Sequence, residues 1–420
     1  MAIGSTTTRA WRMGNAMIRS VGLFRSDDWD TMDIEAMRLD AMLENGEFAV
    51  HTHRDPADAA CAWRHLEENA FGTLFTSYEW LASWYEYVGR NRGIEAVIVV
   101  GEIDGEPAFL LPLAVMKSCG GALRLGRFLG DFHGNQNSGL WRRDVFAGIH
   151  GKSLRKTLLR IGREHNIDLF DLKYVPATMD ERVHPLIDRH ATESLNAVHA
   201  FALQPDFEAL YKERRSASAR KKLRVKEKKL AELGGLVWRK AADEETALHF
   251  LDTLIAQRSA RQASQGIPNV FEPADVRSFL ADQLKGAIRD HSEHVTIHAL
   301  EAGGRIRATY LCGVQYGRYH AYTNSIDEDV AVHSPGDVLL NHVIADACRL
   351  GAHTFDFGLG AERYKTAWAE KEVLMDVEIP VTLKGHLAQR GIKQVRNLKR
   401  RIRNSPALWQ LVRGMRKLKG

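Results

Sequence analysis

Residues 334–368 constrain the fold more than any other part of the chain, because they combine a turn, a helical pattern, a short apolar run and a polar loop. Ser334 and Pro335 form a helix start, and apolar residues then recur at helical spacing until Gly351. The run 354–357 is too short and too apolar for a second helix. It predicts a strand that is buried on both faces, which is typical of α/β proteins.

The loop after this strand collects side chains that can bind and react. Gly358 and Gly360 end the strand, and Glu362, Tyr364 and Lys365 follow. A carboxylate, a phenol and an amine at the carboxyl end of a strand, beside a helix N-terminus, occupy the usual ligand position of α/β proteins. The pattern alone leaves open an ordinary helix–strand unit whose glycines serve only turns.

Several short motifs occur in a fixed order along the chain. They are Phe75-Thr76-Ser77, Glu79-Trp80-Leu81 with Trp84, Leu111-Pro112-Leu113, Leu129-Gly130-Asp131 with Asn135 and Asn137, Pro335-Gly336, Phe355-Asp356-Phe357-Gly358 with Gly360, and Tyr364-Lys365 with Trp368. This set resembles the CelD/BcsL-type acetyltransferases of the GNAT superfamily, which are associated with cellulose or exopolysaccharide biosynthesis. The resemblance implies acetyl-CoA or another acyl-CoA as a cosubstrate and no tightly bound cofactor.

The two halves of the chain repeat one order of elements. A hairpin over 96–116, a helix over 153–161 and a strand over 167–174 are predicted in the first half. The second half has a hairpin over 295–316, a third strand, a helix and the strand 354–357. This echo indicates a duplicated unit, with chance similarity as the alternative. The resemblance likewise implies an α/β fold of tandem GNAT-like (acyl-CoA N-acyltransferase) domains, with mixed sheets flanked by helices, similar to the FemABX peptidyltransferases.

The length of 420 residues exceeds that of a usual single core and favours two domains. The predicted segments are a flexible N-terminal extension (1–45), an N-terminal GNAT-like domain (46–205), a basic helical connector (206–235), a C-terminal GNAT-like acetyltransferase domain (236–382) and a basic amphipathic tail (383–420). Within the first domain, a continuous helical pattern is expected over residues 60–88.

The charges are distributed unevenly. The formal net charge is +5, yet no acidic residue follows Glu378, whereas twelve Lys and Arg residues do. On both sides of Pro406, apolar residues recur at steps of three and four, which predicts two basic amphipathic helices. The expected partner of residues 383–420 is the anionic face of a bilayer. Packing of the apolar stripes against the rest of the protein is the alternative.

Two kinds of protein are disfavoured. No stretch approaches the roughly 18 consecutive apolar residues of a membrane-spanning helix, and the N-terminus lacks the apolar region of a signal peptide. We therefore expect a cytoplasmic protein that is peripheral on the inner face of the membrane. Cys61, Cys119, Cys312 and Cys348 are scattered without metal-ligand spacing, so no metal site is predicted.

The helix that starts near Ser334 is the expected site for the diphosphate of coenzyme A. The GNAT arrangement, as the resemblance implies it, places this group against free N–H groups and the positive dipole end of the helix. Those groups belong here to Ser334, Gly336, Asp337 and Val338. The usual GNAT signature, Arg or Gln followed by x-x-Gly-x-Gly/Ala, is absent, and Asp337 places a carboxylate near this helix end. We expect Asp337 to cap the helix.

Four residues are the predicted catalytic groups. Asp356 lies in a strand expected to be buried, so it needs a partner, which Lys365 or backbone donors are expected to supply. Tyr364 can protonate a leaving thiolate, and His320, which titrates near neutrality, is the candidate general base. The alternatives are a structural ion pair for Asp356, packing of Tyr364 on Trp368 and a structural role for His320.

Two further groups are the predicted substrate-binding residues. In the first half, a polar loop holds Asp131, His133, Asn135 and Asn137, with a plain solvated loop as the alternative. In the second half, alternation along a strand places Tyr322 and Asn324 on the same face as His320.

The region between the halves is strongly basic. Nine Lys and Arg residues lie between Arg214 and Lys229, in a pattern that predicts one long helix. A solvated connecting helix is one interpretation. The other is a clamp for phosphate groups, either of coenzyme A or of a nucleic acid backbone.

Together these features predict an acyltransferase that moves an acetyl or acyl group from acyl-CoA to an amine or hydroxyl of a sugar or cell-envelope/exopolysaccharide precursor. Acyl transfer needs no covalent enzyme intermediate, which agrees with the lack of a G-x-S-x-G motif. Two alternatives remain. One is FemABX-like transfer from aminoacyl-tRNA, the only case in which a nucleic acid is expected. The other is a noncatalytic membrane-associated scaffold of polysaccharide assembly.

Overall fold

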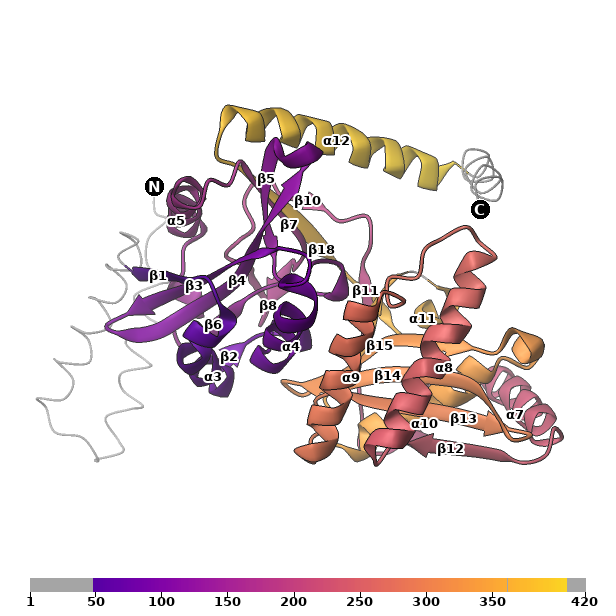
Figure 1. Cartoon of the computed structure of the whole chain (residues 1–420). Coiled ribbons are helices and arrows are strands. Elements are labelled where there is room, and N and C mark those ends of the chain that lie inside the picture. Colours follow the sequence, from indigo (N-terminus) through magenta and orange to yellow (C-terminus); the bar gives the residue numbers. More distant parts are fainter. Residues whose placement is uncertain (1–47, 361, 406–420) are drawn as a thin grey trace, which may run out of the picture.

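The computed structural model describes residues 48–360 and 362–405. Two mixed sheets lie beside one another, each flanked by helices (Figure 1). This arrangement confirms the predicted α/β class. The predicted flexible extension 1–45 and the tail residues 406–420 lie outside the described residues.

The first sheet is built mainly from the N-terminal half. Its strands, in spatial order, are β1 (Ala49–His53), β3 (Glu95–Ile103), β4 (Glu106–Ser118), β5 (Leu123–Phe128), β7 (Leu169–Pro176), β18 (Leu374–Pro380) and β10 (Thr192–Glu193), with β6 (Leu140–Arg142) and β2 (Ala70–Phe71) beside β4. The helices of this half are α3 (Ala60–Glu68), α4 (Tyr78–Trp84) and α5 (Gly151–Glu164). A separate hairpin is formed by β8 (Thr178–Met179) and β9 (Arg182–Val183).

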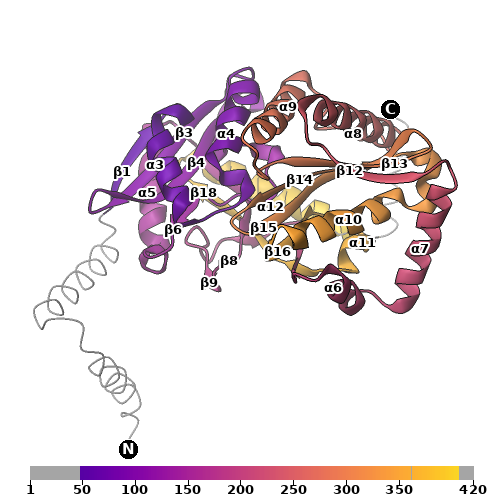
Figure 2. The same ribbon diagram turned by 90° about the horizontal axis from the view of Figure 1, so that it is seen from below.

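The second sheet follows the same plan. Its strands are β12 (Leu236–Lys240), β13 (Thr296–Ala302), β14 (Arg305–Gln315), β15 (Arg318–Ile326), β16 (Thr354–Leu359), β11 (Val198–Ala202) and β17 (Glu370–Glu372). The helices are α6 (Phe207–Arg214), α7 (Ala217–Ala231), α8 (Glu244–Ala263), α9 (Ala274–Arg289), α10 (Pro335–Arg349) and α11 (Arg363–Thr366). Figure 2 shows α8 and α9 on one face of this sheet and α10 on the other.

The two sheets share one strand order and one unusual pairing. In both, a central antiparallel hairpin is followed by a strand that pairs in parallel with the strand after the next helix, β5 with β7 and β15 with β16. A sixth strand then pairs antiparallel, β18 in the first sheet and β11 in the second. This repetition confirms the duplicated unit that the sequence indicates.

The halves exchange their sixth strands. β11 lies in the sequence of the first half but pairs with β16 of the second sheet, and β18 returns from the end of the second half to pair with β7. A linear division at residues 205 and 382 did not anticipate this exchange. Each sheet is therefore completed by chain from the other half.

The halves also share apolar packing. Ile98 and Val100 of β3 face a core that continues into α8 and α9, whereas Val97 and Val99 face a second core within the first half. At the junction, the Trp80 ring of α4 packs edge-on against Phe279 of α9, with ring centroids 4.9 Å apart. The two halves are therefore joined by a continuous hydrophobic interior.

Two helix predictions are wrong in their extent. The pattern over 60–88 is divided into α3, β2, a 3-10 turn and α4. Gly72, between β2 and the 3-10 turn, packs so closely that an added Cβ atom would lie 2.5 Å from the Leu140 side chain. The basic connector forms two helices rather than one. Ser216 separates them, and its Oγ accepts a hydrogen bond of 3.2 Å from the Ala219 amide and so caps α7.

A final helix, α12 (Leu383–Asn404), lies along the outside of the first half (Figure 1). It confirms that the first tail segment is helical; the second segment, after Pro406, lies outside the described residues. Over the residues that the structure describes, no helix is long and apolar enough to cross a membrane.

We predict that a chain ending at residue 372 loses the cooperative fold of its first half, whereas a chain ending at residue 405 keeps it. The shorter chain lacks β18, which leaves an edge of β7 unpaired and removes Val377 and Ile379 from the core. Each buried side chain contributes roughly 2 kcal/mol, a large share of a typical free energy of unfolding of about 10 kcal/mol. Urea unfolding followed by tryptophan fluorescence measures the difference. Equal unfolding curves for the two chains would contradict the exchange.

Candidate functional site

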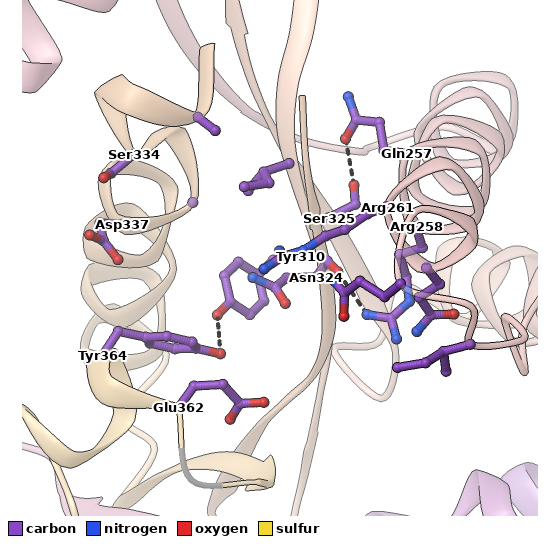
Figure 3. A pocket seen from close by; sticks show the side chains of 16 residues that line it. Gln257, Arg258, Arg261, Tyr310, Asn324, Ser325, Ser334, Asp337, Glu362 and Tyr364 are labelled. Carbon is purple, nitrogen blue, oxygen red and sulfur yellow. Dashed lines mark hydrogen bonds between the residues drawn. The ribbon is translucent and has the colours of Figure 1, made fainter. Parts of the chain in front are cut away.

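A cavity of about 450 Å³ opens where β15 and β16 separate (Figure 3). These strands pair only from Arg318 with Thr354 to His320 with Asp356 and then diverge. The cavity lies near the ends of both strands, between the N-terminus of α10 and the side of α8. Its lining side chains include Gln257, Arg258, Arg261, Tyr310, Asn324, Ser334, Asp337, Glu362 and Tyr364.

The first turn of α10 borders the cavity but offers few free amides. Ser334 precedes the helix in the left-handed conformation, with φ of 46°. Its amide donates to the Ala331 carbonyl, and the amides of Asp337 and Val338 both donate to the Ser334 carbonyl. Of the four predicted amides, at most that of Gly336 is open to a ligand. Val338 is moreover buried in the core of the second half, so the predicted amide cradle is not formed as expected.

Asp337 does not cap α10, in contrast to the prediction. It lies in the first turn of the helix, after the N-cap residue Ser334, which itself makes no side-chain capping bond. The Asp337 side chain lines the cavity instead. Burial raises the pKa of this carboxyl, and the nearby Lys226 and Arg215 partly oppose that effect.

Two tyrosines face the cavity together. The Tyr364 hydroxyl lies 3.4 Å from the Tyr310 hydroxyl, within hydrogen-bonding distance (Figure 3). Burial raises the pKa of Tyr364 to about 12 and that of Tyr310 well above its usual value. Both phenols are therefore protonated at neutral pH, and Tyr310 donates its hydrogen bond to the Tyr364 hydroxyl at the cavity wall.

Helix α8 supplies the positive charge of the cavity. Arg258 donates a 3.0 Å hydrogen bond to the Asn324 carbonyl, and its guanidinium lies 5.1 Å from the centre of the Phe271 ring. Arg261, on the same helix, also lines the cavity. Neither arginine nor Tyr310 is predicted from the sequence. The only local signal for the arginines is a pair of cations three residues apart in a helix, which is common on protein surfaces.

A second cavity of about 450 Å³ adjoins the first and shares Asp337 and Tyr364 with it. Its basic lining residues are Arg215, Lys222, Lys226 and Arg363, and Trp368 forms part of its wall. Lys226 also donates a 2.6 Å hydrogen bond to the Ser334 hydroxyl, which ties α7 to the start of α10. The basic connector thus faces the candidate site.

Asp356 lies at the point where β15 and β16 separate, fully buried and multiply bonded. It accepts hydrogen bonds from Arg318 Nε at 2.8 Å, from the Gly358 amide at 2.7 Å and from the Gln136 side chain of the first half. Burial by itself would raise the pKa of Asp356, but the Arg318 guanidinium and the His320 ring hold it well below its usual range. The group is a structural anion that links the halves.

Of the two partners predicted for Asp356, the structure confirms a backbone donor, the Gly358 amide, and not Lys365. The Lys365 ammonium donates to the Leu359 carbonyl at 2.6 Å and pairs with Glu362 at 2.9 Å. The lysine therefore closes the loop that carries Tyr364 onto the end of β16. The sequence placed Lys365 close to Asp356, but the turn at Gly358 and Gly360 directs its side chain to that loop.

His320 is buried beside Asp356, with Nδ1 3.5 Å from the carboxylate, and it is not among the residues that line the cavity. Burial lowers the pKa of His320, although Asp356 acts in the opposite direction. Its ring packs edge-on against Phe75 of the first half. The neutral ring occupies the interface between the halves rather than the cavity.

The polar loop of the first half packs into the same interface. His133 accepts a 3.0 Å hydrogen bond from Trp84 Nε1, and its carbonyl accepts one of 3.0 Å from the Tyr322 hydroxyl. Asn137 is buried and donates to the Lys173 carbonyl at 3.3 Å. Asn135 lies against Gly358, where an added Cβ atom would be 2.5 Å from the Asn135 amide nitrogen. The side chain of Asp131 lies outside the described part of the structure.

The structure thus brings together only part of the predicted set. Tyr364, Ser334, Gly336, Asp337 and Asn324 line the first cavity. Asp356, His320, Lys365, His133, Asn137 and Tyr322 form the buried frame beside or beneath it. Within the described residues, no group of three or more His, Cys, Asp or Glu side chains is arranged to hold a metal ion.

The equivalent helix start in the first half is covered. α5 corresponds to α10 in the repeated plan, but its first residue, Gly151, lies so close to residue 185 that an added Cβ atom would be 2.8 Å from the Pro185 carbonyl oxygen. Pro185 and Leu186 are buried over this helix end. Of the two equivalent helix starts, that of α10 borders a cavity.

Comparisons with known proteins agree with this plan. Residues 217–366 match the family model described as "Acetyltransferase (GNAT) domain". The fold is that of the GNAT superfamily. The crystal structure of FemX is 11% identical, with a TM-score of 0.54, and the match covers 81% of this chain and 99% of FemX. No curated protein matches the chain by sequence.

A second solved structure has the same fold. It is the C-terminal domain of a putative lysylphosphatidylglycerol synthetase from Agrobacterium fabrum, with 10% identity and a TM-score of 0.50, and the match covers 80% of this chain and 95% of that domain. The GNAT match falls on the half that carries the open cavity. The fold is therefore that of tandem GNAT domains, and the matched GNAT domain lies in the second half.

We predict that Asp356→Asn destabilises the protein by on the order of 3 kcal/mol at pH 7, because it leaves Arg318 without its buried counter-ion. The pKa of Asp356 is lower in the folded protein than in the unfolded chain, where it is about 4. The ionised carboxylate therefore stabilises the fold fully above about pH 4, and this contribution is lost as the pH falls from there towards the pKa of the folded state. The difference between variant and wild type should therefore narrow below about pH 4. Urea unfolding at several pH values measures it.

Asp252→Asn is the matched control. Asp252 forms an exposed ion pair with Arg277, and such pairs contribute about 0–1 kcal/mol. Two results would contradict the structural role of Asp356. One is a loss of unfolding free energy in Asp252→Asn as large as that in Asp356→Asn. The other is a difference in unfolding free energy between Asp356→Asn and wild type that does not change with pH.

Proposed function

We propose that this GNAT protein is a CelD/BcsL-type acyltransferase that moves an acetyl or acyl group from acyl-CoA to an amine or hydroxyl of a sugar or cell-envelope/exopolysaccharide precursor. The observation that carries the proposal is the protonated Tyr364 in a cavity that also holds Arg258 and Arg261. A thioester donor needs both features, a cationic surface for its phosphates and an acid for its leaving thiolate.

In this proposal the donor phosphates are held by side chains rather than by backbone amides. Arg258 and Arg261 line one cavity, and Lys222 and Lys226 line the neighbouring one, with Tyr364 between them. The positive end of α10 adds to the field in the shared region. Two adjoining cavities of about 450 Å³ offer room for an extended nucleotide thioester.

The transfer step follows from the groups at the cavity wall. The acceptor nitrogen or oxygen attacks the thioester carbonyl carbon, the new bond forms and the carbon–sulfur bond breaks. Tyr364 gives its proton to the departing sulfur. Asp337 or Glu362, the two carboxylates of the cavity, takes the proton of the acceptor. His320 and Lys365 position the site: His320 lies against Asp356, and Lys365 closes the loop before Tyr364.

The acceptor side is assigned to the junction of the halves. Asn324 lines the cavity, and Asn135 lies against Gly358 at the separation of the strands. His133, Tyr322 and Asn137 hold the loop from the first half in place. We place Asp131 in the same acceptor group. An envelope precursor as acceptor puts the reaction in the cytoplasm, close to the inner face of the membrane.

We predict that Tyr364→Phe lowers kcat about 100-fold with little change in KM for acetyl-CoA, because the leaving thiolate loses its acid. Release of thiol in the presence of an amino-sugar acceptor measures the effect. Tyr316→Phe is the control, since the Tyr316 hydroxyl is buried, has no hydrogen-bond partner among the described residues and does not line the cavity. Equal rates for wild type and Tyr364→Phe would remove Tyr364 from the mechanism.

Transfer from aminoacyl-tRNA is the second candidate, and the basic second cavity favours it. Arg215, Lys222, Lys226 and Arg363 lie together beside Tyr364, where they can hold the phosphates of a nucleic acid end as well as those of coenzyme A. Incubation with acetyl-CoA or with charged tRNA separates the two donors, since thiol is released in one case and tRNA is deacylated in the other.

We predict that the pair of substitutions Arg215→Ala and Lys222→Ala raises KM for the true donor about tenfold, while kcat stays within about twofold, since these cations bind phosphate and do not take part in proton transfer. Lys221→Ala with Arg224→Ala removes two exposed cations of α7 that do not line the cavity, and should leave KM unchanged. Equal losses in both pairs would indicate a general effect of charge.

A noncatalytic scaffold remains the third candidate. It predicts normal polymer output from a stably folded protein that carries Tyr364→Phe and turns over neither donor.

A further inference from the structure

Helix α12 packs on the first half with its polar face. Arg396 is buried, with its guanidinium 2.6 Å from Glu378 and 3.6 Å from Asp376 of β18. Gln389 donates to the Glu378 carbonyl at 3.2 Å. Near the start of the helix, Gly385 lies against Asp168, where there is no room for a side chain. Buried charge and a close backbone approach, rather than apolar packing, attach this helix.

Four large apolar residues of α12 are exposed. Leu383, Leu387, Val395 and Leu398 are 84%, 67%, 53% and 57% exposed. At 3.6 residues per turn, Leu383, Leu387 and Leu398 fall on one narrow stripe, opposite Arg396. A surface helix normally buries this stripe against the core. The leucine stripe of α12 therefore faces outward, whereas Ile392 and Ile402 are half-buried, so the apolar residues of this helix are divided between its two faces.

The exposed surface of α12 also carries positive charge. Arg390, Lys399 and Arg401 are exposed, and none of them forms an ion pair with another described residue. No acidic residue occurs in the sequence after Glu378. Exposed leucines that share one helix face mark a binding surface, and unpaired cations of one sign near them select an anionic partner.

We propose that the outward face of α12 binds the surface of a bilayer that contains anionic lipid. The leucines enter the boundary between headgroups and acyl chains, and the flanking cations lie at the level of the lipid phosphates. Figure 1 shows α12 on the outside of the first half, whereas α8 and α10, which line the candidate cavity, belong to the second half. The protein binds the membrane without covering its cavity. This inference does not depend on the proposed acyl transfer.

The test is flotation of the full-length protein with vesicles of phosphatidylcholine, with and without phosphatidylglycerol. We expect at least about tenfold stronger binding to the anionic vesicles, weakened by added salt. Leu387→Ser combined with Leu398→Ser should reduce that binding about tenfold. Val183→Ser combined with Val237→Ser, which changes two equally exposed apolar residues elsewhere, should not.

Three outcomes would overturn the proposal. The first is no binding to anionic vesicles. The second is full binding by the leucine variant together with loss of binding in a chain that ends at residue 405, which would assign the binding to residues 406–420. The third is a change of the leucine variant from dimer to monomer in size-exclusion chromatography without a change in vesicle binding, which would identify a protein interface. Circular dichroism of each variant checks the fold, and thiol release from acetyl-CoA without vesicles tests the acyl transfer separately.

Discussion

The buried carboxylate of Asp356 is the constraint on which the site and the joining of the halves both depend. It lies where β15 and β16 separate and is neutralised by Arg318 from the neighbouring strand. It also accepts a hydrogen bond from Gln136 of the other half, and Gly358 completes its shell. An ionised carboxylate in a dry interior is tolerated only when its partners are in place. One anion therefore lies at the opening of the sheet and also contributes to the contact between the halves.

The two halves have equivalent strand orders, but of their two equivalent helix starts one is covered and the other borders a cavity. Their strand orders are equivalent, yet residue 185 covers the start of α5, whereas the start of α10 borders a cavity. The first half supports that cavity in three ways: it contributes β11 to the second sheet, inserts the loop around His133, and packs Trp80 against Phe279. In the duplicated fold, the second half thus contains the cavity, and the first half supports the walls of that cavity.

Cationic side chains, more than free backbone amides, surround the candidate site. At the left-handed turn around Ser334, the amides of Ser334, Asp337 and Val338 are bonded to backbone carbonyls. The cations Arg258, Arg261 and Lys226 line the cavities beside this turn. Charge also determines how α12 packs, because the buried ion pair between Arg396 and Glu378 turns that side of the helix toward β18 and the leucines toward solvent. In both places, buried or partly buried charge, rather than local helix geometry, determines which surface is offered to a partner.

Periodicity and turn residues determined the hairpins, the pair α10 and β16, the duplicated plan and the place of Tyr364 after a buried strand, because these depend on neighbours in the sequence. Only the tertiary structure decided the exchange of β11 and β18, the approach of Arg258 and Tyr310 to Tyr364, and the pairing of Lys365 with Glu362 rather than Asp356. The same holds for α12: its amphipathic pattern is local, but the face that packs is set by acidic residues on β18. Contacts between distant residues leave no trace in local spacing, because they are selected by packing and by the cost of burying an unpaired charge.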